Sequence, residues 1–288
     1  MLEFSGKEVE QLIAKAIEVK KKPKKFGKAL AGKTLAMLFQ KTSTRTRMSF
    51  ETGMTQLGGH AIFLDWRATN FTLGSLEDEM KSMSRFCDAI MFRAYKNEDI
   101  VAAANAATVP LINGLDNLFH PCQALADLMT VKEKLGKLKG AKIAYVGDGN
   151  NVCNSLIIAC AKTGTKISVA TPKGLEPNRV AIGEGKKAGV LQLFNDPKQA
   201  VEGAQVVYTD TWISMGEEDQ KEQKIKQFAG FTVDKNLLGK ALFMHCLPAH
   251  RGVEVTDEVL DSKQSIVFDQ AENRMHAQKA LLLELIKK

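Results

Sequence analysis

Short apolar runs alternate with amphipathic segments along nearly the whole chain of 288 residues. A short apolar run predicts a buried strand, whereas apolar residues spaced three or four apart predict a helix. Regular alternation of the two is typical of a parallel sheet covered by helices, because parallel strands need long crossover connections. We therefore expect an α/β fold, with strands at 34–39, 60–64, 88–93, 109–113, 142–146, 166–170, 190–194, 205–209, 242–245 and 265–268.

The chain is long enough for two such domains, each with its own core. Helices are expected at 5–21, from the turn near 43 to about 57, and at 76–86, 98–107, 121–135, 151–163, 177–188, 256–261 and 271–286. We expect one domain over 1–125 and a second over 126–270, with helix 271–288 packing back on the first. The tract 217–227 is charged on nearly all sides and predicts an exposed helix or loop.

Composition argues against several classes of protein. The chain is 44% hydrophobic and 25% charged, which is typical of globular domains. Its net charge is +7, but the basic run at 20–25 ends a helix and has no interleaved aromatic residues for nucleic acid. Five cysteines without a C-x-x-C pair favour a reducing compartment, and no apolar run approaches the length of a membrane span. We expect a cytoplasmic protein that binds neither nucleic acid nor membrane.

A turn rich in hydroxyl and guanidinium groups follows the first expected strand. It contains Ser43, Thr44, Arg45, Thr46 and Arg47, and a helical pattern begins after it. A helix N-terminus offers unpaired amides and a positive dipole end, and arginine matches phosphate oxygens bidentately. The turn therefore predicts a phosphate site. The alternative is an ordinary helix cap followed by a solvated basic turn.

A second polar turn follows strand 142–146. Gly147 and Gly149 resemble the start of a dinucleotide-binding fingerprint, but Val152 stands where the third glycine is needed. We favour a substrate loop at the carboxyl edge of the sheet, in which the amide of Asn151 pairs with a polar group. A nicotinamide cofactor is the weaker alternative.

Two further positions carry candidate ligands. His120 precedes Pro121 at the start of a helix, and Gln123 lies one turn in, so both side chains can face one ligand. A purely structural histidine is the alternative. Asp210 follows strand 205–209 and can bind an ammonium group or cap a helix.

The segment after strand 242–245 combines His245, Cys246 and His250. This set suggests metal ligation or a cysteine–histidine nucleophile. The spacing does not match a zinc site, which argues against a metal. A nucleophilic thiol would need an orienting group, and no carboxylate for it is identifiable in the sequence.

Together and in chain order, these motifs resemble the transcarbamoylase family, in particular its ornithine-specific members. Segments 43–47 (S-T-R-T-R) and 120–123 (H-P-C-Q) are similar to the two carbamoyl-phosphate signatures of that family. Segment 210–216 contains D-x-x-x-S-M-G and segment 245–248 reads H-C-L-P, both typical of ornithine enzymes. E-N-R at 272–274 matches as well. Aspartate-specific members share the first two motifs but lack the ornithine pair.

The resemblance implies two doubly wound parallel-sheet domains joined by helices, with the active site in the cleft between them. The first domain would bind carbamoyl phosphate and the second would bind L-ornithine. The implied reaction transfers the carbamoyl group to the δ-amine, giving L-citrulline and phosphate, without a metal or an organic cofactor. A homotrimer with shared sites is also implied.

The resemblance also assigns residues to carbamoyl phosphate. Its phosphate would be held by Ser43, Thr44, Arg45 and Thr46. Arg93 would bridge the phosphate and the carbonyl oxygen, which His120 would also contact. Gln123 would bind the carbamoyl nitrogen, and Arg274 would complete the pocket.

Ornithine would be bound by the second domain. The α-amino and α-carboxylate end would be held by Asn151, Asp210, Ser214 and Met215. Cys246 and the backbone of Leu247 would position the attacking δ-amine. The implied catalytic residues are Arg45, Arg93, His120, Asp210, Cys246 and Arg274.

One loop departs from the family pattern. Leu73-Gly74 runs directly into Ser75, so the loop over 71–79, which in the family reaches the site of a neighbouring subunit, is shortened. Glu79 replaces the usual threonine. Two alternative functions are a carbamoyltransferase acting on another amine, such as putrescine, and a non-catalytic protein that retains the fold.

Overall fold

The computed structural model describes residues 1–212 and 221–286, which divide into two α/β units. The N-terminal unit comprises Glu10–Met129 and Glu272–Lys288, and the C-terminal unit comprises Met1–Val9 and Thr130–Ala271. The helices that run from one unit into the other are α1 (Gly6–Lys21), α6 (Pro121–Leu135) and α13 (Val267–Leu285).

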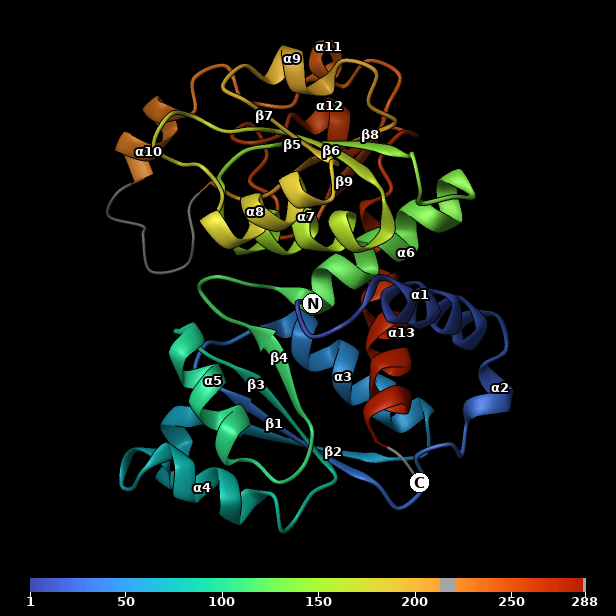
Figure 1. Ribbon diagram of the computed structural model, residues 1–288, viewed down its shortest axis with the longest axis vertical. Helices are drawn as coiled ribbons and strands as arrows, with labels where there is room; N and C mark the ends of the chain where they lie inside the picture. Colours follow the sequence, from blue (N-terminus) through green and yellow to red (C-terminus); the bar gives the residue numbers. More distant parts are fainter. Residues whose placement is uncertain (213–220, 287–288) are drawn as a thin grey trace. The chain divides into compact units, whose positions relative to one another are not determined.

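A parallel sheet forms the centre of the N-terminal unit. Its order is β2-β1-β3-β4, with bounds His60–Asp65 (β2), Thr34–Phe39 (β1), Ala89–Arg93 (β3) and Leu111–Leu115 (β4). The other helices of this unit are α2 (Pro23–Phe26), α3 (Thr44–Gln56), α4 (Leu76–Met83) and α5 (Asn97–Ala106), with 3-10 turns at Trp66–Ala68 and Asn70–Thr72. Figure 1 shows α4 and α5 on one face of the sheet and α3 on the other.

The central strands of this sheet, β1 and β3, are buried on both faces. In β1, Ala36 and Leu38 belong to the cluster that packs against α4 and α5. Leu35 and Met37 are also buried and point to the opposite face, because successive side chains in a strand alternate. Double burial explains why these strands read as continuous apolar runs in the sequence.

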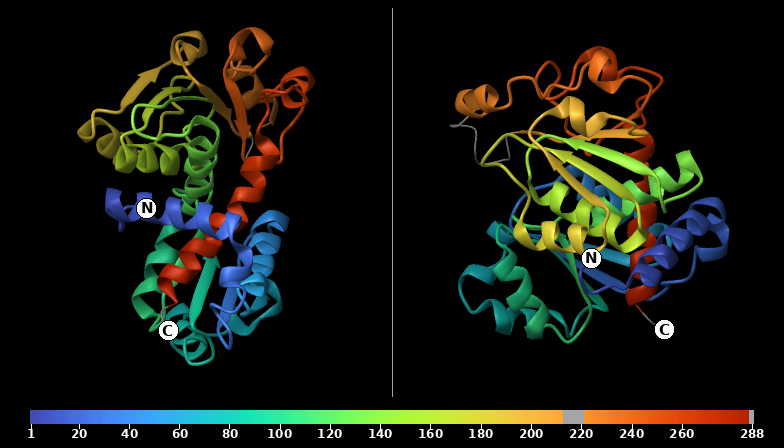
Figure 2. Two further views of the ribbon diagram at one scale, coloured as in Figure 1. Left: turned by 90° about the vertical axis from the view of Figure 1, so that its right-hand side faces the viewer. Right: turned by 45° about the horizontal axis from the view of Figure 1, so that its top comes forward.

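The C-terminal unit contains a second parallel sheet. Its order is β7-β6-β5-β8-β9, with bounds Leu191–Phe194 (β7), Lys166–Ala170 (β6), Lys142–Val146 (β5), Val206–Thr209 (β8) and Leu242–His245 (β9). One face carries α7 (Asn151–Thr163) and α8 (Arg179–Lys187), and the other carries α9 (Pro197–Val201), α11 (Lys235–Leu238) and α12 (Asp257–Leu260), as Figures 1 and 2 show. Helix α10 covers Lys221–Gln227.

Trp212 anchors the segment that follows β8 in the core of this unit. Its side chain is 2% exposed and stacks on Phe228, with ring centroids 4.6 Å apart and planes 8° apart. Phe231 meets Phe228 edge-on at 5.9 Å. A large buried aromatic residue thus fixes the chain two positions after Asp210.

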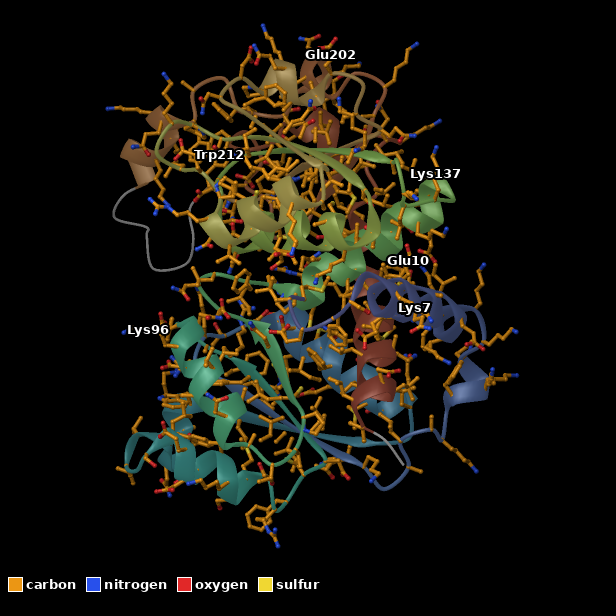
Figure 3. All side chains as sticks on the ribbon, viewed as in Figure 1. Lys7, Glu10, Lys96, Lys137, Glu202 and Trp212 are labelled. Carbon is orange, nitrogen blue, oxygen red and sulfur yellow. The ribbon has the colours of Figure 1, made fainter. Side chains whose placement is uncertain are left out.

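Charged side chains lie on the surface of both units. Of the residues labelled in Figure 3, Trp212 is buried, and the exposed ones are Lys7, Glu10, Lys96, Lys137 and Glu202. The basic run at 20–25 spans the end of α1, as expected for lysines at a helix C-terminus. Within 1–212 and 221–286, no helix is both long enough and apolar enough to cross a membrane.

Two all-parallel sheets confirm the predicted fold class, but one predicted strand is wrong. Residues 265–268 form no strand: Ser265 makes an isolated bridge with Phe243, and α13 begins at Val267. Val267 and Gln270 are both fully buried, at the spacing of one helical turn. A short apolar run does not distinguish a buried strand from the start of a helix.

Helices α9 and α11 lie outside the elements expected from the sequence. Each begins after an aspartate cap: Asp196 accepts from the Lys198 amide at 2.9 Å, and Asp234 accepts from the Leu237 amide at 2.8 Å. Both helices are too short to show an apolar period, so the local signals were their aspartate caps and, in α9, Pro197 at the first position.

We predict that Gly149→Ala destabilises the C-terminal unit. A Cβ at this position would lie 2.4–2.5 Å from backbone atoms of Leu175, Glu176 and Pro177, so the backbone would have to move. Overpacking of this kind costs about 1–3 kcal/mol, which should lower the melting temperature measured by circular dichroism.

The matched control is Gly183→Ala in α8, where a Cβ meets nothing within 4 Å. This change should be neutral or should stabilise the protein by up to about 1 kcal/mol. Equal melting temperatures for the two variants would contradict the close packing at Gly149.

Candidate active site

The carboxyl ends of three neighbouring strands form one edge of the N-terminal sheet. Phe39 in β1 is aligned with Arg93 in β3, and Arg93 is aligned with Leu115 in β4. The amide of Gln40 donates to the carbonyl oxygen of Arg93 at 2.9 Å. Strand order changes direction between β1 and β3, and such a switch point is where open α/β sheets bind ligands.

The polar turn after β1 leads directly into α3. Ser43 caps this helix, because its Oγ accepts from the Thr46 amide at 3.3 Å. A backbone hydrogen bond of the first turn runs from the Arg47 amide to the Ser43 carbonyl. The amides of Thr44 and Arg45 precede it, at the positive end of the helix dipole. From the sequence alone, a helix cap and a phosphate site are alternative interpretations of this turn. In the structure the same turn can serve as both.

The two arginines of this turn have different surroundings. Arg47 is exposed, donates from Nε to Glu51 at 2.8 Å and lies 3.8 Å from the centre of the Phe63 ring. Arg45 is half-buried and makes no hydrogen bond or ion pair with another described residue. Protein groups already engage Arg47, so Arg45 is the better candidate for binding an anion.

Buried cationic groups adjoin this turn. Arg274, from α13, donates from Nη2 to Thr46 Oγ1 at 2.8 Å, although 228 positions separate the two residues. Arg274 and Arg93 are 4% and 5% exposed. Burial, followed by the positive charges of Arg274 and Arg93, holds the pKa of His120 well below its usual 6.5. The imidazole is therefore neutral at neutral pH, and the surrounding charge favours an anion.

The side-chain amide of Gln123 is oriented by an aspartate one turn further along α6. Both side chains are buried, and Gln123 Nε2 donates to Asp127 Oδ1 at 2.8 Å. Because a carboxylate accepts hydrogen bonds, the nitrogen must face Asp127. The oxygen Oε1 has no hydrogen-bond partner among the described residues. It can therefore accept from an N–H group of a ligand.

Asp116 organises the loop that leads to His120. Its fully buried carboxylate accepts hydrogen bonds, each of 2.7 Å, from the amides of Leu118 and Phe119 and from the side chains of Asn97 and Asn113. These bonds hold the backbone of 116–119 immediately before His120. The available sequence signal was an aspartate directly after a strand, which favours turns of this kind.

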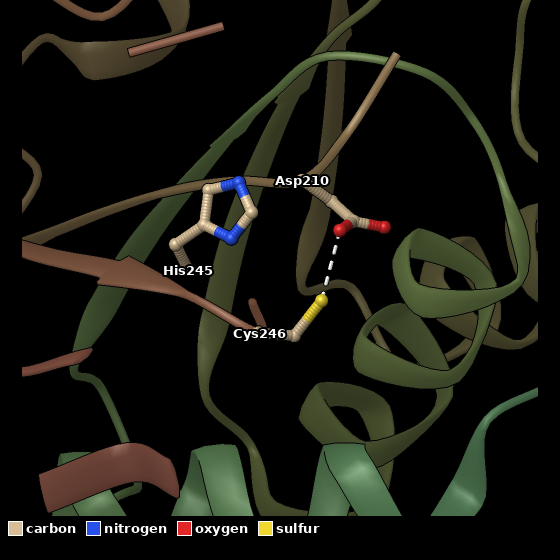
Figure 4. Close-up of side chains that lie close together, drawn as sticks. All are labelled: Asp210, His245 and Cys246. Atoms are coloured by element: carbon tan, nitrogen blue, oxygen red, sulfur yellow. Dashed lines mark hydrogen bonds between the residues drawn. The ribbon is translucent and has the colours of Figure 1, made fainter. Parts of the chain in front are cut away.

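The C-terminal sheet presents a second group of polar residues at the ends of β5, β8 and β9. Thr209 at the end of β8 is aligned with His245 at the end of β9, so the following residues, Asp210 and Cys246, are neighbours. The Cys246 thiol donates to Asp210 Oδ1 at 2.8 Å (Figure 4). Strand register thus provides the carboxylate that the sequence alone does not identify for this thiol.

The second oxygen of Asp210 is bonded by Asn150, a residue that the sequence analysis does not single out. Asn150 Nδ2 donates to Asp210 Oδ2 at 2.8 Å, while its Oδ1 accepts from the amides of Val152 and Cys153 as the cap of α7. Asn151 is the first residue of α7. Asp210 therefore connects the loops that follow β5, β8 and β9.

The glycines after β5 are explained by packing. Gly147 has a φ of +152°, which favours glycine, and a Cβ there would lie 3.4 Å from Thr209 Oγ1. Gly149 lies against the backbone of 175–177 and donates its amide to the Leu175 carbonyl at 3.0 Å. Neither glycine therefore needs a dinucleotide to account for it.

His245 is fully buried, and the protein uses both of its ring nitrogens. Nδ1 accepts from the Leu247 amide at 2.9 Å, and Nε2 lies 3.1 Å from Glu254 Oε1. Asp210, His245 and Cys246 offer ligand atoms within 4.8 Å of one another, and Figure 4 shows the three side chains together. Because both nitrogens of His245 are engaged, this group lacks the free imidazole that a metal site of this composition requires.

The described residues of the predicted site divide between the two units. The N-terminal unit contains Ser43, Thr44, Arg45, Thr46, Arg93, His120, Gln123 and Arg274. The C-terminal unit contains Asn151, Asp210, Cys246 and Leu247. Ser214 and Met215 lie outside the described residues. The supporting residues that the sequence analysis misses are Asp116, Asp127, Asn150 and Glu254.

Two protein-family models match the chain. Residues 1–133 match the model described as aspartate/ornithine carbamoyltransferase, carbamoyl-P binding domain. Residues 139–285 match the model described as aspartate/ornithine carbamoyltransferase, Asp/Orn binding domain.

Individual proteins are similar over most of their length. An ornithine carbamoyltransferase of Methanocorpusculum labreanum is 54% identical over 263 residues, which are 89% of this chain and 86% of that protein. The structure of ornithine carbamoyltransferase from Pyrococcus furiosus has a TM-score of 0.92 at 48% identity, covering 97% of this chain and 93% of that one. The structure of the anabolic ornithine carbamoyltransferase from Campylobacter jejuni has a TM-score of 0.92 at 40% identity, covering 98% and 96%.

We predict that His120 makes stability depend on pH. Its pKa is depressed in the folded protein, so folding favours the neutral imidazole. Above pH 6.5, the usual pKa of an unfolded histidine, the imidazole is neutral in both states and His120 does not destabilise the fold. As pH falls below that value, the unfolded chain binds a proton that the folded protein does not, so the free energy of unfolding decreases. The contribution to the free energy of unfolding should fall by about 1.4 kcal/mol per pH unit in that range.

Urea denaturation at several pH values between 7.5 and 5 measures this effect. His120→Asn, which cannot be protonated, should lose less stability on acidification than the wild-type protein. The control is His60→Asn at an exposed histidine, which should keep the wild-type dependence. Identical pH dependence in His120→Asn and the wild type would contradict the prediction.

Proposed function

The chain belongs to the aspartate/ornithine carbamoyltransferase family and is a carbamoyltransferase, and we propose that it carbamoylates the δ-amine of L-ornithine to give L-citrulline and phosphate. The observation that carries this proposal is the buried contact of Arg274 with Thr46 beside Arg93 and His120. The relatives compared above are named ornithine carbamoyltransferases. The enzyme of Campylobacter jejuni is named anabolic, which favours citrulline synthesis and hence arginine biosynthesis.

Carbamoyl phosphate binds to the N-terminal unit in this proposal. Its phosphate accepts hydrogen bonds at the start of α3 from Ser43, Thr44, Arg45 and Thr46. Arg93 and Arg274 neutralise the charge of the phosphate and of the carbonyl oxygen. The neutral imidazole of His120 contacts that oxygen without adding a charge of its own. Oε1 of Gln123 accepts from the carbamoyl NH₂ group, since Asp127 already holds the amide nitrogen.

The chemistry is the attack of the ornithine δ-nitrogen on the carbamoyl carbon. Negative charge grows first on the carbonyl oxygen and then on the phosphate, as the bond from carbon to the phosphate oxygen breaks and the amine loses a proton. Arg93, His120 and Arg274 are fixed in place before the reaction, so they stabilise this charge without rearranging.

Ornithine binds to the C-terminal unit. Asp210 and Asn151 hold the amino-acid end, together with Ser214 and Met215. The Cys246 thiol and the backbone of Leu247 position the δ-amine. The amide of Leu247 already donates to His245, so the carbonyl oxygen of Leu247 is the group left to receive an amine N–H.

We further propose a homotrimer located in the cytoplasm. Family resemblance supports the trimer, and exposed apolar side chains of the N-terminal unit, Met48 (62%), Leu73 (81%) and Phe86 (76%), are suited to subunit contacts. None of the five cysteines forms a disulfide within the described residues, which supports a reducing compartment. Light scattering tests the assembly: we expect three times the chain mass of 31.6 kDa, whereas a monomeric mass would contradict it.

We predict that Arg45→Ala severely impairs citrulline formation. Losing a donor that stabilises developing charge costs about 2.7–4 kcal/mol, so kcat/KM for carbamoyl phosphate should fall by about 100- to 1000-fold. Arg47→Ala is the matched control, because Arg47 is engaged by Glu51 and Phe63, and a much smaller loss is expected.

The assay measures citrulline from purified protein at saturating substrates. Ornithine and putrescine are compared as acceptors, and ornithine should be strongly preferred, since Asp210 recognises an amino-acid end. Full activity of Arg45→Ala would show that the phosphate site is wrongly assigned. No citrulline from the wild type would refute the function.

A further inference from the structure

A buried carboxylate, that of Glu254, contacts segment 245–250, which contains the last residue of β9 and the loop after it. Glu254 and His245 are both 0% exposed, and Glu254 Oε1 lies 3.1 Å from His245 Nε2. The same oxygen accepts from the His250 amide at 2.5 Å. A buried carboxylate loses its hydration and needs hydrogen bonds in exchange. Both of these partners belong to the segment that carries Cys246 and Leu247.

The contact with Glu254 determines which nitrogen of His245 carries the proton. A carboxylate accepts, so Nε2 carries the hydrogen and Nδ1 becomes an acceptor. The Leu247 amide donates to this Nδ1 at 2.9 Å. Glu254 therefore acts on the backbone of Leu247 through the imidazole ring.

The backbone of Leu247 depends on such support. Its φ is +59°, a conformation that residues other than glycine rarely adopt and that persists only where the surroundings hold it. The neighbouring Cys246 places its thiol 2.8 Å from Asp210. A change in the backbone at Leu247 would therefore move both groups assigned to the δ-amine.

A second contact connects this loop to the segment after β8. His250 Nδ1 lies 3.1 Å from Thr211 Oγ1 and 3.6 Å from Glu254 Oε2. Thr211 follows Asp210 directly. Glu254 is thus connected to the segments after β8 and β9, which supply Asp210 and Cys246 to the proposed ornithine site.

We propose that Glu254 is a positioning residue for ornithine binding, which orients His245 so that it holds the backbone of Leu247 and keeps Cys246 beside Asp210. The inference rests on the proposed function, because it concerns the groups assigned to ornithine. Glu254 contacts the substrate only through these residues.

Two substitutions of His245 separate its two contacts. The side-chain oxygen of asparagine lies near the place of Nδ1, so His245→Asn keeps an acceptor for Leu247 but loses Glu254. The nitrogen of glutamine lies near the place of Nε2, so His245→Gln keeps Glu254 but loses the acceptor. Small displacements of reacting groups can lower the reaction rate by up to about 100-fold. We expect the KM for ornithine to rise more in His245→Gln than in His245→Asn. The KM for carbamoyl phosphate should be unchanged in both.

Two substitutions of Glu254 test the carboxylate itself. Glu254→Ala removes the acceptor for His245 and His250 and should raise the KM for ornithine, whereas Glu254→Gln retains an accepting oxygen and should recover most of the affinity. The matched control is Glu258→Ala, at an exposed glutamate of α12 that pairs with Lys235 at 2.7 Å. A lower melting temperature in Glu254→Ala without a selective rise in the ornithine KM would overturn the proposal, as would equal KM values in the two His245 variants.

Hydrogen exchange of the Leu247 amide, followed by NMR, separates this inference from the proposed function. The amide should be protected in the wild type and in His245→Asn, and it should exchange faster in His245→Gln whether or not the protein is active. This pattern without citrulline formation would support the network and refute the function. Citrulline formation with equal exchange in all three proteins would refute the network alone.

Discussion

The hydrogen-bonded register of the parallel strands is the constraint on which both proposed binding sites depend, one in each unit. Register aligns Phe39 with Arg93 in one sheet and Thr209 with His245 in the other. The residues that follow these strand ends are therefore neighbours, although they come from distant segments of the chain. Helices cover both faces of each sheet, and polar side chains therefore gather at the carboxyl edges. The proposed chemistry depends on that geometry.

The two proposed binding sites have opposite electrostatic character. In the N-terminal unit, Arg93 and Arg274 are buried around a neutral His120, which suits a phosphorylated anion. In the C-terminal unit, a carboxylate, that of Asp210, is bonded by Asn150 and by the Cys246 thiol, which suits an amine-bearing substrate. A reaction between an acyl phosphate and an amine needs cationic groups for the phosphate and a carboxylate for the amine. Because these groups belong to separate units, each is stabilised by its own neighbours.

Much of the architecture could be predicted because strands such as β1, β5, β6 and β9 are buried along nearly their whole length. The expected bounds of β1, β5, β6 and β9 agree with the structure to the residue, and the H-P-C-Q and S-T-R-T-R motifs lie at helix starts as expected. Prediction failed where local periodicity carries little information. The run 265–268 belongs largely to α13, and α9 and α11 are too short to show a helical period.

The sequence alone determined the fold class, the strand ends at which polar motifs stand, and the family to which those motifs belong, because apolar periodicity and local motifs are properties of neighbouring residues. Only the tertiary structure decided which atoms meet. It placed Asn150 on Asp210, turned the oxygen of Gln123 away from Asp127, and set the proton of His245 through Glu254. These choices depend on strand register and on contacts between distant segments, which the local pattern of a sequence does not contain.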